Sequence, residues 1–333
     1  MRCPCSALVA IGLLLAASEF QPAGETRIRV LSWNVSGRAP VEQPDMFRGH
    51  LQLAEPDVVL LDEVDGSLAQ AAVGALFKDV PGRTGNSWTV LWGQRGGRQR
   101  IVMAARSAID VVAEFQRNVY PPPDIDAVVA AAEPEARDRL RRELGNGIPV
   151  NAATLQTGNG TILLVAIDLQ CCGGRWQEIR RLAEARHVRQ LVAETIQTVG
   201  ADGVILTGDF NLAAPPPGTG GTGVLPLVVL SGPYPPPIHG LIAAEALHRD
   251  GQEAWTINSG DTSGFPHLPF DFQLYSPHSL RAVDAYVLDT ADYSERDLDR
   301  AGLNRTASAE LSTHRPVVVT YEWRDRPLKR RGG

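Results

Sequence analysis

Short apolar runs recur along the chain, and polar side chains stand at the ends of these runs. The clearest run covers residues 203–206, and after two further residues the chain continues with Asp209, Phe210 and Asn211. Because alternate residues of a strand point to the same side, Asp209 and Asn211 are expected to project together from the end of a buried strand. A turn that only terminates the strand is the alternative interpretation of an Asp-x-Asn sequence.

Five further segments repeat this combination of an apolar run with an acid, an amide or an imidazole. The predicted strands cover 27–34, 56–61, 161–167, 283–288 and 317–323, and the polar residues that accompany them are, in order, Asn34, Asp62 with Glu63, Asp168, Asp284 and His314. Polar residues placed by chance would scatter over the loops. We therefore expect these side chains to converge at one edge of a sheet and to form a site.

Helical patterns lie between the predicted strands. Residues 175–198 carry apolar side chains at helical spacing, with His187 expected at the boundary between the buried and exposed faces. The Ala-rich segment 126–144 predicts a helix that Pro134 breaks or kinks and that ends at Gly145. The Pro- and Gly-rich segment 215–237 is predicted to be a surface loop that could rim the cleft.

The first 24 residues are typical of a secretory signal peptide. Arg2 precedes an apolar run, residues 7–17, that is too short to span a bilayer, and small residues follow. An uncleaved N-terminal anchor is the alternative. We expect a secreted or periplasmic protein with no transmembrane segment after signal removal, a single domain over 25–324 and a basic tail over 325–333.

Loss of residues 1–24 would leave Cys171 and Cys172 as the remaining cysteines. In an exported protein this adjacent pair could form a vicinal disulfide or stay as two thiols, and the sequence leaves both open. Contiguous cysteines chelate zinc poorly, so we interpret the pair as structural. Redox control is the alternative role.

The net charge of the chain is −6. A nonspecific nucleic-acid binder usually carries a basic field, so this balance argues against such a protein. Arginines concentrate at Arg95, Arg98, Arg100 and Arg106, where they could face a phosphate substrate.

The ordered set of motifs resembles the endonuclease/exonuclease/phosphatase superfamily, which contains DNase I-like nucleases, abasic-site endonucleases, inositol polyphosphate phosphatases and neutral sphingomyelinases. The residues that carry the resemblance are Leu31-Ser32-Trp33-Asn34, Leu61-Asp62-Glu63, Gly208-Asp209-Phe210-Asn211, the segment Arg281 to Tyr286 and the segment Ser312 to Val317. The resemblance implies an α/β (α+β) fold of the DNase I-like kind. That fold is a four-layer sandwich, in which two mixed β-sheets pack face to face with flanking helices outside.

The resemblance also implies a magnesium site at one edge of the sheets, with Mn²⁺ as an alternative ion. Glu63 would be the principal metal ligand with Asn34 close by, because Mg²⁺ prefers a hard oxygen shell. Asp209 would orient or deprotonate the attacking water, and Asn211 would hold the phosphate or the metal shell.

His314, steadied by Asp284, would donate to a phosphate oxygen as negative charge develops in the transition state. Each of these residues also has a purely structural interpretation. Asn34 could cap a turn, and Asp284 could pair with Arg281. These structural interpretations do not predict the order of the motifs.

Three positions depart from the family pattern. Many members have Gln where Asp62 stands, and strand alternation is expected to turn Asp62 away from Glu63. DNase-like and sphingomyelinase-like members have His where Asp168 stands, so Asp168 either recruits a second cation or reflects a different treatment of the leaving group. Thr313 replaces an Asp that usually precedes the last His.

The sequence therefore predicts an exported, metal-dependent phosphoesterase, expected to be a monomer. Its substrate could be nucleic acid, a phospholipid headgroup or a soluble phosphate ester. The alternative is a binding or scaffold protein on the same fold that has lost turnover. A serine hydrolase is excluded because no G-x-S-x-G motif is present.

Overall fold

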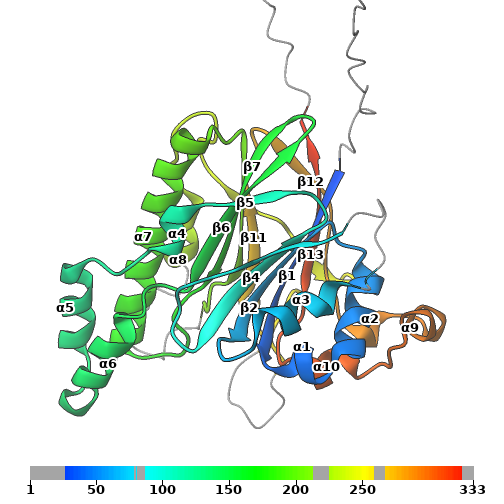
Figure 1. Cartoon of the computed structure of the whole chain (residues 1–333), viewed down its shortest axis with the longest axis horizontal. Coiled ribbons are helices and arrows are strands. Elements are labelled where there is room, and N and C mark those ends of the chain that lie inside the picture. Colours follow the sequence, from blue (N-terminus) through cyan, green and yellow to red (C-terminus); the bar gives the residue numbers. More distant parts are fainter. Residues whose placement is uncertain (1–26, 79, 81–86, 213–224, 259–266, 325–333) are drawn as a thin grey trace, which may run out of the picture.

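Two β-sheets packed face to face form the centre of the protein, and helices cover both outer faces (Figure 1). The computed structural model describes residues 27–78, 80, 87–212, 225–258 and 267–324. The predicted signal peptide (1–24) and the predicted basic tail (325–333) lie outside these ranges. The observed layers confirm the predicted four-layer sandwich.

The first sheet has seven strands and is mixed. Its strands, in spatial order, are β10 (Leu247–His248), β12 (Leu280–Val287), β13 (Val317–Trp323), β1 (Arg27–Gly37), β2 (Val58–Asp65), β4 (Gln99–Ala105) and β3 (Thr89–Trp92). β1 runs parallel to β2, and β10 runs parallel to β12, whereas the other neighbours are antiparallel. The parallel pair β1 and β2 brings Asn34 and Asp62 directly opposite each other.

The second sheet has six strands. In spatial order they are β5 (Ile109–Val111), β6 (Val150–Thr157), β7 (Gly160–Asp168), β8 (Gly203–Asp209), β11 (Asp271–Tyr275) and β9 (Ile242–Ala243). β7 and β8 are parallel, and the long helix α7 (Arg175–Val199) connects them, as parallel pairing requires. The predicted strands at 161–167 and 203–206 and the predicted helix at 175–198 are thus confirmed.

Strand alternation divides the apolar side chains between two layers. Val30, Leu60 and Ile205 point into the core between the sheets. Their neighbours Leu31 and Leu61 point outward, beneath the helices. Burial of each such side chain stabilises the fold by about 1.5–3 kcal/mol, which explains why these strands read as continuous apolar runs.

Five short helices cover the seven-stranded sheet: α1 (Ala39–Glu42), α2 (Pro44–Ala54), α3 (Gln70–Lys78), α9 (Glu295–Ala301) and α10 (Ala307–Leu311), with the 3₁₀ turn η2 (Thr290–Asp292) among them. α2 and α9 approach closely at Gly49. A Cβ there would lie 2.6 Å from the carbonyl oxygen of Ala301, so only glycine allows this contact.

The six-stranded sheet is covered by α4 (Ala113–Gln116), α5 (Pro122–Ala131), the 3₁₀ turn η1 (Pro134–Ala136), α6 (Arg137–Leu144), α7 and α8 (Leu225–Ser231). The predicted helix at 126–144 is divided at Pro134 and ends at Gly145, as expected. His187 is half-buried on α7, also as expected. The prediction of a loop at 215–237 is partly wrong, because its apolar part forms α8; residues 213–224 lie outside the described residues.

Within the described part of the chain, no helix combines the length and the apolar character that crossing a membrane requires.

Candidate active site

The ends of several strands from both sheets meet at one edge of the sandwich, the lower edge in Figure 1. Asn34 lies opposite Asp62 across β1 and β2, and Asp168 lies opposite Asp209 across β7 and β8. β11 adds a further acid, because Asp271 pairs with Asp209 in the antiparallel register. The predicted convergence is therefore observed for Asn34, Asp62, Asp168 and Asp209, at an edge that both sheets share.

Asp209 occupies the centre of this group and is fully buried. Its Oδ1 accepts a hydrogen bond from the backbone N–H of Asn211 at 2.8 Å, and its Oδ2 accepts one from Nδ2 of Asn34 at 3.2 Å. Asn211 adopts a left-handed backbone (φ 48°) and donates from Nδ2 to the carbonyl of Leu169 at 2.8 Å. The Asp-x-Asn sequence thus forms an Asx turn, and this turn fixes the orientation of the Asp209 carboxylate.

Gly208 allows β8 to lie close to β7 just before Asp209. Its φ is +132°, and a Cβ at this position would lie 1.9 Å from the carbonyl oxygen of Ile167 on the neighbouring strand. No side chain fits between two backbones at that separation.

His314 contacts two carboxylates. Its Nδ1 donates to Oδ2 of Asp271 at 2.8 Å, and its Nε2 lies 3.8 Å from Oδ2 of Asp209. The preceding segment is anchored to β1, since the indole of Trp33 donates to the carbonyl of His314 and the hydroxyl of Ser312 donates to the carbonyl of Asn34. The imidazole therefore bridges the acids of β8 and β11.

The prediction that Asp284 steadies His314 is wrong. Asp284 is exposed on β12, where it lies opposite Thr320 of β13. Asp284 pairs with Thr320 inside β13, away from the edge, whereas Asp271 pairs with Asp209 at the edge and takes this place. A signal for it was present in the sequence, since Asp271 begins the alternating segment Phe272 to Tyr275.

The charges around His314 determine its protonation. Burial alone lowers its pKa, but the charges of Asp271 and Asp209 outweigh burial and raise the pKa of His314 to about 10. Burial and the charge of Asp271 in turn raise the pKa of Asp209 to about 7, although His314 lowers it. At neutral pH the site thus holds an imidazolium beside a carboxyl group that titrates close to neutrality.

A β-bulge shapes the end of β2. The register with β4 shifts after Leu61, the register with β1 shifts after the pair of Asn34 and Asp62, and Glu63 adopts a left-handed backbone (φ 54°). Glu63 is partly exposed, and its charge acts on Asp62 and Asp168. Asp62 continues the alternation of β2 on the same side as Leu60, so it points between the sheets and lies buried with Asp168 and Asp209, whereas Glu63 is partly exposed.

Two groups of side chains in the described residues have the spacing of metal ligands. One is Asp209, Asp271 and His314, and the other is Asp62, Asp168 and Asp209; within each group the ligand atoms lie within 4.8 Å of one another. Oxygen-rich sets of this kind fit Mg²⁺ or Mn²⁺. Glu63 belongs to neither group, and the Nδ2 of Asn34 is engaged with Asp209, so their predicted roles as metal ligands stay predictions.

The family model described as "Endonuclease/Exonuclease/phosphatase family" matches residues 31–312, which is most of the chain. The chain belongs to this family. A comparison with curated protein sequences found no match.

Solved structures of endonuclease/exonuclease/phosphatase proteins share the fold at low sequence identity. An endonuclease/exonuclease/phosphatase protein from Beutenbergia cavernae DSM 12333 is similar over 91% of this chain and 73% of its own, with 16% identity and a TM-score of 0.58. Truncated Caenorhabditis elegans TDP2 is similar over 90% and 99%, with 15% identity and a TM-score of 0.55. The 3′ phosphatase NExo from Neisseria, bound to product DNA hairpin, is similar over 89% and 100%, with 16% identity and a TM-score of 0.51.

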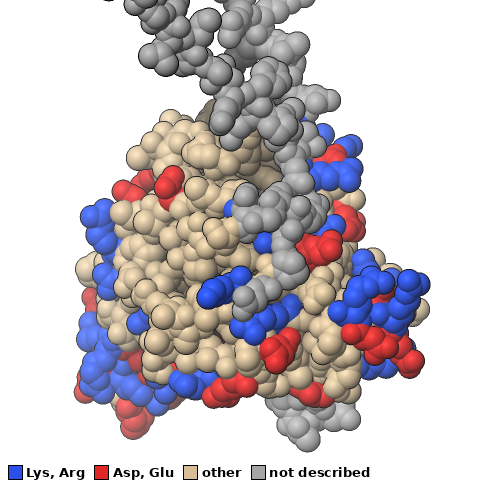
Figure 2. All heavy atoms as spheres, turned by 45° about the vertical axis from the view of Figure 1, so that its right-hand side comes forward, with Lys and Arg blue, Asp and Glu red and all other residues tan. Residues whose placement is uncertain are grey.

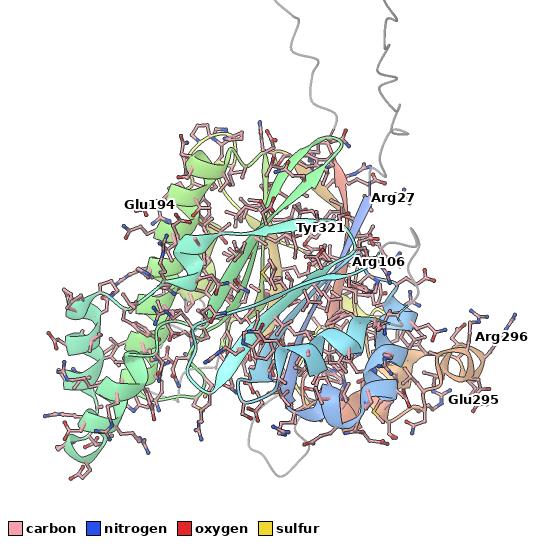
Figure 3. All side chains as sticks on the ribbon, viewed as in Figure 1. Arg27, Arg106, Glu194, Glu295, Arg296 and Tyr321 are labelled. Atoms are coloured by element: carbon pink, nitrogen blue, oxygen red, sulfur yellow. The ribbon has the colours of Figure 1, made fainter. Side chains whose placement is uncertain are left out.

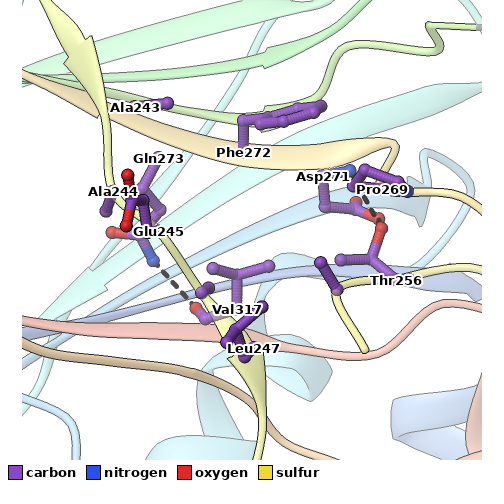
Figure 4. A pocket seen from close by; sticks show the side chains of 12 residues that line it. Ala243, Ala244, Glu245, Leu247, Thr256, Pro269, Asp271, Phe272, Gln273 and Val317 are labelled. Atoms are coloured by element: carbon purple, nitrogen blue, oxygen red, sulfur yellow. Dashed lines mark hydrogen bonds between the residues drawn. The ribbon is translucent and has the colours of Figure 1, made fainter. Parts of the chain in front are cut away.

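A pocket of about 320 Å³ adjoins the candidate active site at Asp271 (Figure 4). Asp271 and Thr256 line it at one end, where the Thr256 hydroxyl donates to Oδ2 of Asp271 at 2.6 Å. The remaining lining is mostly apolar and comes from β11 and the segment 243–247. The pocket thus reaches the acid that holds His314.

The segment after β7 carries Cys171 and Cys172 as two thiols with sulfurs 2.9 Å apart. Of the two states that the sequence left open, the structure has the thiols. Buried Arg181 holds this segment by donating to the carbonyl oxygens of Gln170 and Cys172 at 2.7 and 2.5 Å. Burial and the neighbouring Cys172 raise the pKa of the Cys171 thiol.

Proposed function

We propose that the protein is a metal-dependent phosphoesterase that hydrolyses a phosphate ester by attack of a water molecule. The observation that carries the proposal is the arrangement of His314 between Asp271 and Asp209 at the edge where the strand ends meet. A fixed carboxylate next to a protonated imidazole supplies both a group that accepts a proton from water and a group that donates to developing negative charge.

In this proposal Asp209 orients or deprotonates the attacking water. Asn34 and the backbone N–H of Asn211 hold its two oxygens, so the carboxylate enters the reaction without reorienting. His314 donates from Nε2 to a non-bridging phosphate oxygen, and Asp271 keeps the ring protonated and aligned through Nδ1. Glu63 and Asn34 are the proposed ligands of Mg²⁺ or Mn²⁺, which when bound supplies Lewis-acid stabilisation of the phosphate oxygens.

The charge of the molecule bears on the substrate. The net charge is −6, and in Figure 2 the Lys and Arg side chains alternate with Asp and Glu on the face in view. Such a surface disfavours nonspecific, processive binding of nucleic acid. The Neisseria 3′ phosphatase, similar in fold, is bound to DNA, so a nucleic-acid end remains among the proposed substrates, with phospholipid headgroups and soluble phosphate esters. We also propose export, on the pattern of residues 1–24, and a monomer.

The test is hydrolysis of a chromogenic phosphodiester, a chromogenic phosphomonoester and DNA by the purified protein, each with Mg²⁺, Mn²⁺ or EDTA. Glu63→Gln and His314→Ala are measured in parallel with Asp110→Asn, which changes an exposed acid on β5. We expect turnover that needs the metal, survives in Asp110→Asn and is lost in the other two variants. A folded protein without turnover on any substrate would instead favour the non-catalytic alternative.

A further inference from the structure

We propose that Asp62, Asp168 and Asp209 form a second divalent-cation site, distinct from the site assigned to Glu63 and Asn34, which takes Mg²⁺ or Mn²⁺. One carboxylate oxygen from each of the three acids lies within 4.8 Å of the others. The three residues come from β2, β7 and β8, so the site joins the two sheets.

The first independent observation is an oxygen without a partner. Asp62 is 1% exposed, and among the described residues its Oδ2 has no hydrogen-bond partner. Leaving a buried polar atom unpaired costs about 1–3 kcal/mol, and more when the group is charged. A cation between the three acids would remove this cost, because carboxylate oxygens are its preferred ligands.

The second observation is the sign of the surrounding charge. The strongest charges acting on Asp62 are those of Asp271, Asp209 and Glu63, and those acting on Asp168 include Glu63 and Asp62. Within the described residues, no Lys or Arg forms an ion pair with any member of the group. Among the described residues, His314 near Asp209 is thus the cation found beside the group, and Asp62 and Asp168 have no such partner.

The carboxylates at this edge outnumber the ligands assigned to one ion. Asp271 already has His314 as a partner, whereas Asp62, Asp168 and Asp209 form a separate group of ligand spacing. An ion at Glu63 and Asn34 would leave these three acids for a second ion. Buried charges persist only when they are paired or bound to a metal.

Existing contacts separate the two groups of metal-ligand spacing. In the group of Asp209, Asp271 and His314, the imidazole Nδ1 and Oδ2 of Asp271 are already engaged with each other. Asp62, Asp168 and Asp209 contain no positive group. The backbone of this second group is also fixed, since the N–H of Asp168 donates to Pro149 and the N–H of Leu169 donates to the carbonyl of Asp209.

The experiment counts bound ions without using turnover, so its result is independent of the proposed phosphoesterase activity. The purified full chain is titrated with Mn²⁺ at pH 7.5, and bound Mn²⁺ is measured by equilibrium dialysis and electron paramagnetic resonance. We expect two ions per chain in the unmodified protein. Asp168→Asn and Asp62→Asn should each weaken one of them by at least about tenfold, the scale on which a metal site responds to loss of a supporting group.

Matched variants identify which ion is lost. Glu63→Gln should retain the ion at Asp62 and lose the other, and Asp110→Asn should retain both. Magnetic coupling between two Mn²⁺ ions in the unmodified protein supplies a readout that needs no variant, so a failure of Asp62→Asn to fold does not remove the test. A single ion per chain, without magnetic coupling and with an affinity that Asp168→Asn leaves unchanged, would overturn the proposal.

Discussion

Protonation of His314 depends on one neighbouring carboxylate more than on any other charge. Burial favours the neutral imidazole, and the 2.8 Å contact with Asp271 contributes most among the charges that oppose burial. In the proposed mechanism, the oxygens of Asp271 do not contact the phosphate or the attacking water. It acts by keeping His314 charged and oriented.

Asp271→Asn should therefore reduce turnover while preserving the shape of the site. The neutral amide would leave the ring of His314 without the charge that holds its proton, and we expect kcat to fall on the order of 10²-fold or more. Steady-state kinetics on the best substrate is the measurement. Asp284→Asn, on exposed β12, should stay within about twofold; a larger loss in Asp284→Asn than in Asp271→Asn would contradict this assignment.

The pH dependence of kcat/KM should show two limbs. Asp209 must be ionised to accept a proton, and its pKa is raised to about 7, so activity should rise with pH up to this range. His314 must be protonated to donate, and its pKa of about 10 places the falling limb there. A bound cation favours the ionised acid and would move the rising limb below 7. In Asp271→Asn the falling limb should move to lower pH; an unmoved limb would argue against the role of His314.

At the scale of the elements, the close approach of β7 and β8 is what brings Asp168 and Asp209 together. Gly208 makes this approach possible, because its φ of +132° and its position against Ile167 both exclude a side chain. The candidate active site therefore depends on a residue that has no side chain.

Gly208→Ala should destabilise the protein by about 3 kcal/mol or more, since it adds a steric clash with backbone to backbone strain. Chemical denaturation gives the free energy of unfolding. The matched control is Gly74→Ala in α3, where nothing lies within 4 Å of the new Cβ and the backbone is helical. That control should be neutral or more stable by up to about 1 kcal/mol. Equal effects of the two substitutions would refute the packing argument.

α7 stabilises the segment after β7 through charges that it buries. Glu184 is fully buried, accepts from the backbone N–H of Gln170 at 2.6 Å, and also pairs with Arg180 at 2.8 Å and with the hydroxyl of Tyr120. The carbonyl of Leu169 in the same segment receives the hydrogen bond of Asn211. The contacts of α7 with residues 169–170 therefore help to hold Asn211, which follows Asp209 in the candidate active site.

Glu184→Ala is expected to cost about 3–5 kcal/mol, because it leaves Arg180 and the N–H of Gln170 without their buried partner. Glu194→Ala on the exposed face of the same helix (Figure 3) should change the free energy of unfolding by less than about 0.5 kcal/mol. Thermal and denaturant unfolding of both variants is the measurement. A small effect of Glu184→Ala would show that the segment is held by other contacts.

The strand ends that the sequence predicted are those that follow continuous apolar runs, such as the run before Asp209. β11 was missed because Gln273 interrupts its apolar pattern. Gln273 is buried and donates to the carbonyl oxygens of Val30 and Val317, both on the opposite sheet. A partner so distant in sequence cannot be read from local periodicity, and the acid at the start of this strand was overlooked with it.

The same reasoning applies to the bulge in β2. The pattern located the strand, but it could not locate the extra residue between Leu61 and Val64 or the left-handed backbone of Glu63, because a bulge depends on pairing with the neighbouring strand β4. The sheets, the layers and the acids at the ends of β2, β7 and β8 were thus predictable. The partner of His314 and the backbone conformation of Glu63 required the tertiary structure.

For the molecule as a whole, the concentration of buried acids links stability to both pH and metal. The pKa of Asp209 is raised from its ordinary value to about 7, and burial raises the pKa values of Asp62 and Asp168 as well. An acid with a raised pKa in the folded state favours folding most when it is protonated. Without metal, this contribution is complete below the unfolded value near 4 and is lost as pH rises through 7.

A divalent cation offsets this loss of stability at higher pH, because it binds the ionised carboxylates of the folded state only. The increase in Tm on adding saturating Mg²⁺ should therefore be small at pH 5 and should grow to about 5 °C or more at pH 8. Differential scanning calorimetry with Mg²⁺ and with EDTA across this range measures it. Asp168→Asn removes one of the acids and should raise the Tm of the metal-free protein at pH 8 while reducing the gain from Mg²⁺. The gain in Tm grows with pH only if the ligands of the cation lose their protons between pH 5 and pH 8. A gain in Tm that is equal at pH 5 and pH 8 would therefore mean that the cation binds away from these acids.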